Sequence, residues 1–313
     1  MVIVLVGPTA SGKTAVSLPL AERTGAEIIS ADSRQIYRHM DIGTAKPTAA
    51  ERARVPHHFI DILDPDQYYS AGEFGVRGRE EIVRILSRGH VALVVGGSGL
   101  YVRSLIDGFF DGPPADPEVR STIEQRFAVG GVKMLLGELR RVDPVFAARV
   151  DPTKPRRMIR ALEVFHMTGV PISQLHARLK VEIPFRARIF GLAWPKPELH
   201  KRIGQRCTMM LEGGLLDEVE DLVRRGYGPG LNALNTVGYA EAFAFRAGEI
   251  TRDEMVELFC RNTRRYAKRQ MTWFRRDERI EWVEMGEGRD VQVVVEEIVK
   301  RCYPNSGVNS LLS

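Results

Sequence analysis

The sequence has few cysteines and no long apolar run. Its three cysteines, Cys207, Cys260 and Cys302, are far apart and match no zinc or disulfide spacing. The apolar start, residues 2–6, is far too short for a signal peptide or a membrane span. The histidine pair at 57–58 has no third ligand at usable spacing, so we interpret it as structural. We therefore expect a cytoplasmic protein without a membrane anchor.

The excess of positive over negative charge is also small. The formal net charge is +5 over 313 residues. The 44% hydrophobic content is enough for two domains, each with its own core. The basic residues are clustered, mainly at 154–160 and 261–276, and clustering favours a polyanionic partner more than an even spread would.

A phosphate-binding loop directly follows the apolar start. The pattern G-x-x-x-x-G-K-[ST] spans Gly7, Pro8, Thr9, Ala10, Ser11, Gly12, Lys13 and Thr14. The glycines let backbone amides turn inward, Lys13 supplies a cation, and the Thr14 hydroxyl is a ligand for Mg²⁺. A helix predicted at 15–23 adds its positive N-terminal end. We expect this phosphate loop to bind a di- or triphosphate, as in ATP-binding and other nucleotide-binding proteins.

Another predicted core strand, residues 91–95, lacks a feature of many nucleotide hydrolases. Those proteins place an acidic residue after a hydrophobic strand, where it binds Mg²⁺ or its water. Here the strand runs into Gly96-Gly-Ser-Gly-Leu-Tyr101. Asp61, at the end of a weaker strand at 58–61, is the remaining alternative. The pattern argues against an ordinary nucleotide hydrolase.

Asp32 is the main candidate for chemistry. It follows a strand predicted at 27–30, and ligands of parallel sheets lie beyond the carboxyl ends of the strands. Asp32 should therefore face the same crevice as Lys13, as a general base or as a metal ligand. Gln35 offers a donor and an acceptor to a base edge. The alternative is that Asp32 only caps the next helix.

The chain divides into a core and an insertion. Residues 1–112 alternate strands and helices, which predicts an α/β fold with a parallel sheet flanked by helices. Prolines at 113–117 indicate a junction, and residues 113–186 are predicted to form an inserted all-helical domain. The core continues over 187–303, mainly helical, with a strand at 188–194, helices at 196–225, 239–275 and 290–302, a strand at 280–283, and a disordered tail at 304–313.

Two segments concentrate positive charge. Arg156, Arg157 and Arg160 fall within one helical turn, where they repel one another unless an anion or a carboxylate lies among them. The second is the segment 261–276, and along it and just before it Phe259, Tyr266 and Trp273 recur every seven residues. Core packing is the simpler explanation for that aromatic stripe, which leaves the basic residues facing phosphates or water.

Eight motifs in order cover the chain from Ile3 to Arg276. They are Gly7-Pro-Thr-Ala-Ser-Gly-Lys-Thr14, Ala31-Asp-Ser-Arg-Gln-Ile-Tyr37, Asp41-Ile-Gly-Thr-Ala-Lys-Pro47, Val55-Pro-His-His-Phe-Ile-Asp61, Gly96-Gly-Ser-Gly-Leu-Tyr101, Arg156-Arg-Met-Ile-Arg-Ala-Leu-Glu163, Asn235-Thr-Val-Gly-Tyr239 and Tyr266-Ala-Lys-Arg-Gln-Met-Thr-Trp-Phe-Arg275. In these motifs the chain resembles the bacterial tRNA dimethylallyltransferases, also called tRNA isopentenyltransferases. It departs from them at Ala240, where a basic residue is usual.

The resemblance implies a reaction and its substrates. A dimethylallyl group would pass from dimethylallyl diphosphate to N6 of the adenosine just 3′ of the anticodon in tRNA, releasing diphosphate. Lys13, Arg206 and Mg²⁺ on Thr14 would stabilise the leaving diphosphate, and Asp32 would take the N6 proton. Asp32, Ser33, Arg34, Gln35 and Ser98 would contact the target base or its neighbours, and Arg156, Arg157, Met158, Ile159 and Arg160 the anticodon stem-loop. We expect a monomer.

Two other functions fit parts of the sequence. A P-loop small-molecule kinase, with Asp32 activating a substrate hydroxyl, explains the first hundred residues equally well but leaves both basic segments unexplained. A non-enzymatic RNA-binding ATPase explains the basic segments but gives Asp32 no role.

Overall fold

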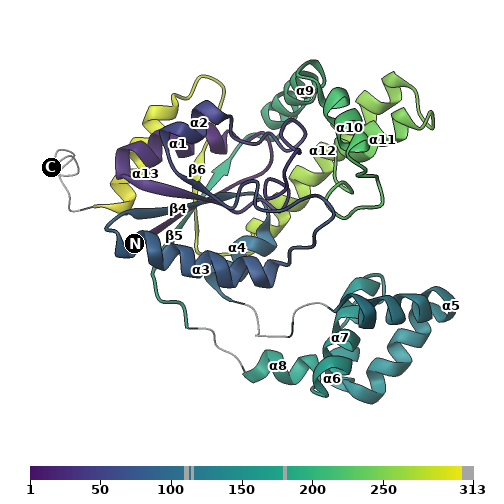
Figure 1. Cartoon of the computed structure of the whole chain (residues 1–313). Helices are drawn as coiled ribbons and strands as arrows, with labels where there is room; N and C mark the ends of the chain where they lie inside the picture. Colours follow the sequence, from purple (N-terminus) through teal and green to yellow (C-terminus); the bar gives the residue numbers. More distant parts are fainter. Residues whose placement is uncertain (109–112, 114–115, 179–181, 305–313) are drawn as a thin grey trace. The chain divides into compact units, whose positions relative to one another are not determined.

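The computed structural model describes residues 1–108, 113, 116–178 and 182–304, in two compact units. One unit combines Met1–Ile106 with Pro184–Ser313, and the other is Asp107–Ile183. The first is an α/β core and the second is helical (Figure 1). The insertion thus runs from 107 to 183, compared with the 113–186 expected. Apart from Pro304, the tail predicted at 304–313 lies outside the described residues.

The core contains a six-stranded sheet in the order β3-β2-β4-β1-β5-β6, with every pair parallel. The strands are β1 (Val2–Val6), β2 (Ala26–Ser30), β3 (His57–His58), β4 (Val91–Gly96), β5 (Ala187–Ala193) and β6 (Ile280–Glu284). The predicted parallel α/β fold is confirmed. The strand expected at 58–61 is wrong beyond His58, because Phe59 and Asp61 have left-handed backbones, with φ of 62° and 56°.

Helices cover both faces of the sheet because the central strand is apolar on both. Val2, Val4 and Val6 pack into one core, and Ile3 and Leu5 pack into the other. The second core includes α1 (Lys13–Thr24) and α13 (Val291–Cys302), and the first includes α3 (Ala71–Ser87) and α4 (Gly99–Ile106) (Figure 1). In Figure 1, α2 (Ala49–Arg54) lies beside α1.

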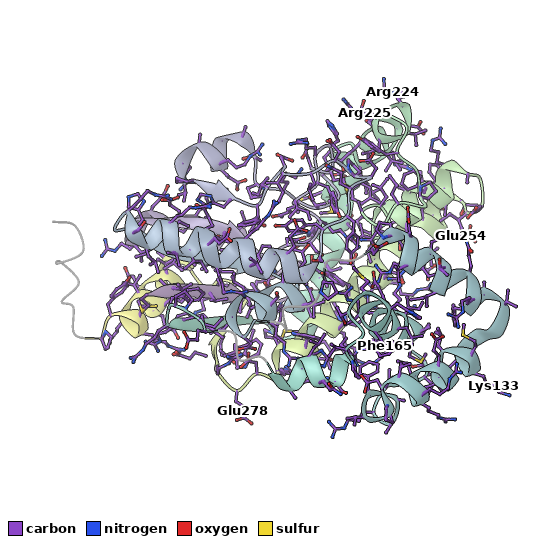
Figure 2. The ribbon with its side chains drawn as sticks, turned by 60° about the horizontal axis from the view of Figure 1, so that its bottom comes forward. Lys133, Phe165, Arg224, Arg225, Glu254 and Glu278 are labelled. Atoms are coloured by element: carbon purple, nitrogen blue, oxygen red, sulfur yellow. The ribbon has the colours of Figure 1, made fainter. Side chains whose placement is uncertain are left out.

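Two predicted helical segments of the core unit are each divided into two helices. The segment 196–225 is two helices, α9 (Lys196–Glu212) and α10 (Leu215–Arg224), separated where Gly214 has a φ of 97°. The segment 239–275 is likewise α11 (Tyr239–Arg246) and α12 (Arg252–Phe274). Thr251 starts α12 with a capping box to Glu254. Charged side chains such as Arg224 and Arg225 project outward from α10 (Figure 2).

The helical unit has a core of its own. Its helices are α5 (Pro117–Val142), α6 (Pro144–Ala147), α7 (Pro155–Thr168) and α8 (Ile172–Arg178). Leu135 and Leu139 of α5 are buried together with Met158 and Leu162 of α7. Gly131, with a φ of 61°, interrupts α5 between the two helices expected there. No helix within the described ranges is long and apolar enough to cross a membrane.

Candidate active site

A cavity of about 640 Å³ lies in the core unit, lined by the segments that follow the carboxyl ends of β1, β2 and β4. Loop residues 42–45 and 236–237 and one face each of α9 and α12 complete its lining. Its volume is typical of small-molecule sites. Lys13, Thr14, Asp32 and Arg206 all reach this cavity, so the four predicted catalytic residues are brought together.

Lys13 is half-buried at the start of α1 and donates hydrogen bonds to the carbonyls of Gly7 and Pro8, at 2.9 and 2.8 Å. Burial, and after it the positive charge of Arg206, lower the pKa of Lys13 to about 7, whereas Asp32 opposes the shift. A bound anion would restore the charged form of this amine. The phosphate loop therefore holds an amine whose charged form a bound anion would stabilise.

The far side of the phosphate loop is fastened by two side chains from the β5–α9 region. The indole of Trp194 donates to the Ser11 carbonyl at 2.9 Å, and the Arg202 Nε donates to the Ala10 carbonyl at 2.9 Å. The Arg202 guanidinium stacks over the Trp194 ring, 4.3 Å from its centroid. The loop is thus held from outside while its concave side faces the cavity.

Asp32 lies in a turn, with no helix after it for its side chain to cap, so the helix-cap alternative is wrong. Its Oδ1 accepts from the Arg34 amide at 2.8 Å, and it makes no other hydrogen bond or ion pair among the described residues. Arg206 on α9 is half-buried, and it too has no such partner in the described part of the chain. Burial lowers the pKa of Arg206, and the charge of Asp32 opposes this shift. The cavity thus contains Lys13, Arg206 and Asp32, each with spare hydrogen-bonding capacity.

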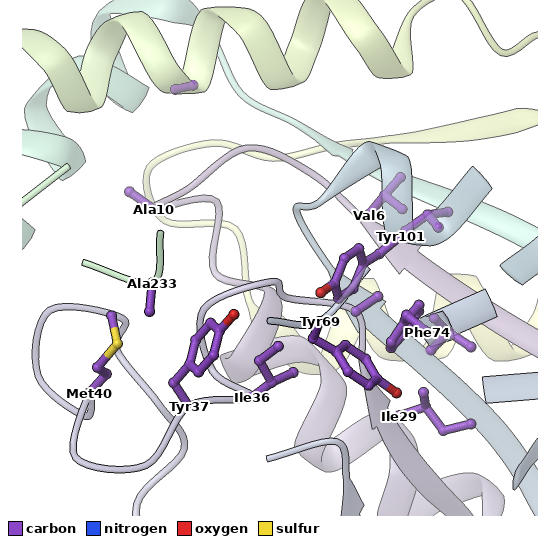
Figure 3. Close-up of a cluster of buried hydrophobic side chains, with 14 of the residues drawn as sticks. Val6, Ala10, Ile29, Ile36, Tyr37, Met40, Tyr69, Phe74, Tyr101 and Ala233 are labelled. Carbon is purple, nitrogen blue, oxygen red and sulfur yellow. The ribbon is translucent and has the colours of Figure 1, made fainter. Parts of the chain in front are cut away.

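The segment after Asp32 is held in place by its buried apolar side chains. Ile36, Tyr37 and Met40 are fully buried in the core cluster that also contains Val6 and Ala10 (Figure 3). This shared core connects the Asp32 segment with β1 and the phosphate loop. The positions of the two main site elements are therefore set by apolar packing as well as by the sheet.

Gln35 does not have the role predicted for it, which was to offer a donor and an acceptor to a base edge. Its Oε1 accepts from the Ser30 hydroxyl at 3.0 Å, and its Nε2 donates to the carbonyls of Thr44 and Ala45 at 3.3 and 3.1 Å. Both ends of the amide are used inside the protein. In this structure Gln35 holds the 44–45 loop and does not present its donors to a base edge.

Glu218 and Tyr239 were missed by the sequence analysis. The Glu218 carboxylate accepts from the amides of Asp41, Ile42 and Gly43 at 2.8, 2.7 and 3.1 Å, and from the Tyr239 hydroxyl at 2.5 Å. A Cβ on Gly43 would lie 2.4 Å from the Tyr239 ring, so only glycine fits there. These contacts fix one wall of the cavity and explain why the 41–47 and 235–239 motifs occur together.

Asp61, the alternative magnesium carboxylate, is committed elsewhere. It pairs with Lys46 at 2.6 Å and with Arg52 at 2.7 Å, and it does not line the cavity. Although burial raises the pKa of Asp61, its hydrogen bonds to these two cations lower it overall. The Asp61 alternative is therefore wrong.

One face of α12 forms a further wall, with Phe259, Thr263, Tyr266 and Gln270 lining the cavity. Burial raises the pKa of Tyr266 to about 12, so its hydroxyl stays neutral. Core packing accounts for Phe259 but not for Tyr266, and Trp273 is 37% exposed. The spacing of the lining residues, at i, i+4, i+7 and i+11, was the signal for this face.

In the helical unit the structure separates the predicted tRNA contacts. Arg156 and Arg157 are exposed, and their side chains make no hydrogen bond or ion pair with another described residue. Arg160 instead bonds to Glu163 at 3.0 Å and to the Pro113 carbonyl at 2.6 Å. Met158 and Ile159 are buried in the core of this unit. Their side chains therefore pack inside the protein, and the prediction that they contact RNA is wrong.

Thr14 is the residue best suited to Mg²⁺. Its hydroxyl faces the cavity and makes no hydrogen bond to another described residue. Asp32 supplies a second oxygen in the same cavity. Magnesium in phosphate sites keeps several waters and takes only one or two protein oxygens together with the substrate phosphates. This sparse set of oxygens fits such an ion.

The chain is similar to known proteins over nearly its whole length. The sequence pattern of the IPP transferase family matches residues 35–277, and the isopentenyl transferase pattern matches residues 1–64. The chain belongs to the IPP transferase family. A tRNA dimethylallyltransferase of Pelotomaculum thermopropionicum is 42% identical over 299 residues, 95% of each chain. Another, from Citrifermentans bemidjiense, is 48% identical over 284 residues, 90% of this chain and 92% of the relative.

Solved structures in the family have the same fold. The full-length tRNA isopentenylpyrophosphate transferase from Bacillus halodurans superposes with a TM-score of 0.72 at 38% identity, covering 97% of this chain and 95% of that one. A eukaryotic dimethylallyltransferase acting on tRNA is alike in fold, with a TM-score of 0.82 at 24% identity, covering 97% of this chain and 80% of that one.

Proposed function

We propose that this chain transfers a dimethylallyl group from dimethylallyl diphosphate to N6 of the adenosine just 3′ of the anticodon in tRNA. One observation carries the proposal: Lys13 and Arg206 lie in the cavity with Asp32, which keeps hydrogen-bonding capacity. The cations suit a leaving diphosphate and the carboxylate suits a departing proton. Membership of the IPP transferase family supports this assignment over a small-molecule kinase or an RNA-binding ATPase.

The leaving group is the first requirement. Breaking the bond between C1 of the allyl group and the diphosphate oxygen leaves a negative charge on that oxygen. The amides at the start of α1, Lys13 and Arg206 stabilise this charge in a cavity that is pre-formed. Mg²⁺, held by Thr14 with Asp32 nearby, would add neutralising charge on the diphosphate.

The acceptor is the second requirement. The adenine N6 lone pair is delocalised into the ring, so N6 must lose a proton as its bond to C1 forms. Asp32 accepts that proton, with Arg34 holding one carboxylate oxygen through its amide. The products are N6-(dimethylallyl)adenosine and diphosphate, and the proton ends on Asp32 before it passes to water.

The target base must leave its stack to enter such a cavity, as in other base-modifying enzymes. Arg34 lines the cavity and makes no side-chain hydrogen bond to a described residue, so it is available to the base or to a neighbouring phosphate. On the helical unit, Arg156 and Arg157 are the exposed cations that we assign to phosphates of the anticodon stem-loop.

The test supplies the protein with carbon-labelled dimethylallyl diphosphate or with γ-labelled ATP, each with and without unmodified tRNA. We expect label in tRNA only from dimethylallyl diphosphate, and digestion to nucleosides should place it on N6 of one adenosine. Transfer of the ATP label to a small molecule would support the kinase alternative instead. ATP hydrolysis stimulated by tRNA, without any transfer, would support the RNA-binding ATPase.

A further inference from the structure

Gln270 connects two cavity segments that are far apart in the sequence. Its Oε1 accepts from the Thr9 amide of the phosphate loop at 2.8 Å. Its Nε2 donates to the Gly97 carbonyl, just after β4, at 2.9 Å. The residue is 7% exposed, and a Cβ on Gly97 would lie 2.2 Å from the Nε2. The carboxamide is thus enclosed, with each end on a different backbone segment.

The Gly97 segment leads directly to Asp32. The Ser98 hydroxyl accepts from the Ser33 amide at 3.0 Å, and the Ser98 amide donates to the Ala31 carbonyl at 3.3 Å. A Cβ on Gly96 would lie 2.1 Å from the Ala31 carbonyl oxygen, so the two segments are in close contact. A continuous series of bonds therefore runs from the phosphate loop through Gln270 to both neighbours of Asp32.

Both bonds require a neutral side chain that carries a donor as well as an acceptor. Thr9 requires an acceptor and Gly97 requires a donor, and glutamine provides both on one side chain. A glutamate at this position keeps the acceptor but loses the donor when ionised. Because the Thr9 amide is bonded to Gln270 and the Ser11 amide to the Pro8 carbonyl, the anion is left to the amides at the start of α1.

We propose that Gln270 is a positioning residue that sets the distance between the diphosphate cradle and Asp32. The inference rests on the proposed function, in which the phosphate loop holds the diphosphate that leaves C1 and Asp32 takes the proton that leaves N6. Misplacement of reacting groups by about 1 Å costs on the order of 10²-fold in rate. Gln270 should therefore govern the transfer step and leave donor binding nearly unchanged.

The test compares Gln270→Met and Gln270→Glu with Gln292→Met, which makes the same change on an exposed residue of α13. We expect Gln270→Met to lower kcat by about 10–10²-fold with little change in the KM for dimethylallyl diphosphate. The Gln292→Met control should retain the wild-type kcat.

The Gln270→Glu variant distinguishes a positioning role from a purely structural one through the pH dependence of its kcat. Its carboxyl can donate to the Gly97 carbonyl only when protonated, so the ratio of its kcat to that of wild type should rise as pH falls. Taking the ratio cancels the titration of Asp32. A ratio that is flat with pH, a rise in KM alone, or a wild-type kcat in Gln270→Met would overturn the inference. Absence of dimethylallyl transfer by the wild type would instead contradict the proposed function.

Discussion

An acidic residue lies at each end of β2, and the two have opposite surroundings. Glu27, near the start of the strand, is surrounded by partners: Arg88 at 2.9 Å from both oxygens, and His58 and His90 at 2.7 Å. Asp32, just beyond the end, has a single amide partner and lies in a cavity with Lys13. We call the Glu27 cluster filled, because its carboxylate is bonded to charged or polar side chains of the protein. We call the Asp32 and Lys13 cluster unfilled, because its side chains keep hydrogen-bonding capacity.

The pKa values reflect this difference. Burial alone would raise the pKa of Glu27, but its bonds to Arg88, His58 and His90 lower it to about 2. Lys13 in the unfilled cluster has its pKa lowered to about 7 by burial and by Arg206. Filled clusters stabilise the fold, whereas unfilled ones are prepared for a ligand.

The largest expected effect is that of Asp32→Asn. Asparagine keeps the shape and the acceptor for the Arg34 amide but cannot accept the N6 proton. We expect the single-turnover rate of transfer to fall by about 10²–10⁴-fold, with donor affinity and thermal unfolding close to wild type. Recovery of most of this loss in excess Mg²⁺ would mean that Asp32 serves as a metal ligand instead.

Glu27→Gln should show the reverse pattern. We expect it to lower the free energy of unfolding by about 2 kcal/mol, less than for a fully enclosed pair because Arg88 and His90 remain half-exposed. Transfer by the folded protein should be unchanged. Glu22→Gln, which removes an exposed pair with Arg54, is the matched control and should change stability little.

The difference in unfolding free energy between wild type and Glu27→Gln should shrink as the pH falls. The pKa of Glu27 is about 2 in the folded protein against a reference value of 4.5. Its stabilisation should be complete above about pH 4.5 and decline as pH falls toward 2. Urea unfolding of wild type and Glu27→Gln at several pH values checks this, and a difference that grows on acidification would contradict the assignment.

The helical unit allows a smaller effect to be measured. Replacing Arg156 and Arg157 together with Gln should weaken tRNA binding and reduce its log–log salt slope by about 0.7–0.9 for each phosphate that the double variant no longer binds. Arg140→Gln with Arg141→Gln is the matched control, since both residues are exposed on the same unit. Equal slopes for the two double variants and wild type would place the RNA contacts elsewhere, with 261–276 the next candidate.

The smallest effect is a shift in pH dependence. Because diphosphate binds the charged form of Lys13, kcat/KM for the donor should fall as pH rises above about 7. Arg206→Met removes a charge that lowers this pKa, so the falling limb should move to higher pH even as kcat/KM drops overall. Movement to lower pH would show that Lys13 is not the titrating group.

Sequence reasoning found the parts of the site that are local in the chain. The apolar strand, the phosphate loop and Asp32 each depend on neighbouring residues, and strand ends in a parallel sheet share one edge. Gln270 and Glu218 escaped because their backbone partners are far away in the sequence, by 173 to 261 positions for Gln270 and by 175 to 177 for Glu218. No local pattern encodes such bonds.

Some of the errors had visible causes. Gly213 and Gly214 together are a helix-ending signal within the helical segment 196–225, and they lie between α9 and α10. Glu163 lies three residues after Arg160, which is the spacing of a helical ion pair. The burial of Met158 and Ile159 follows from the apolar face of α7 on which they lie.

Calorimetric titration with inorganic diphosphate at about pH 8, in two buffers of different ionisation enthalpy, tests most directly whether the cluster beyond β2 is an unfilled anion site. Free Lys13, with a pKa of about 7, is mostly neutral at this pH. Bound diphosphate should raise that pKa and recharge the amine. Wild type should then take up close to one proton more per diphosphate than Lys13→Arg, whose charge does not titrate in this range. Equal proton uptake by the two proteins would contradict the account.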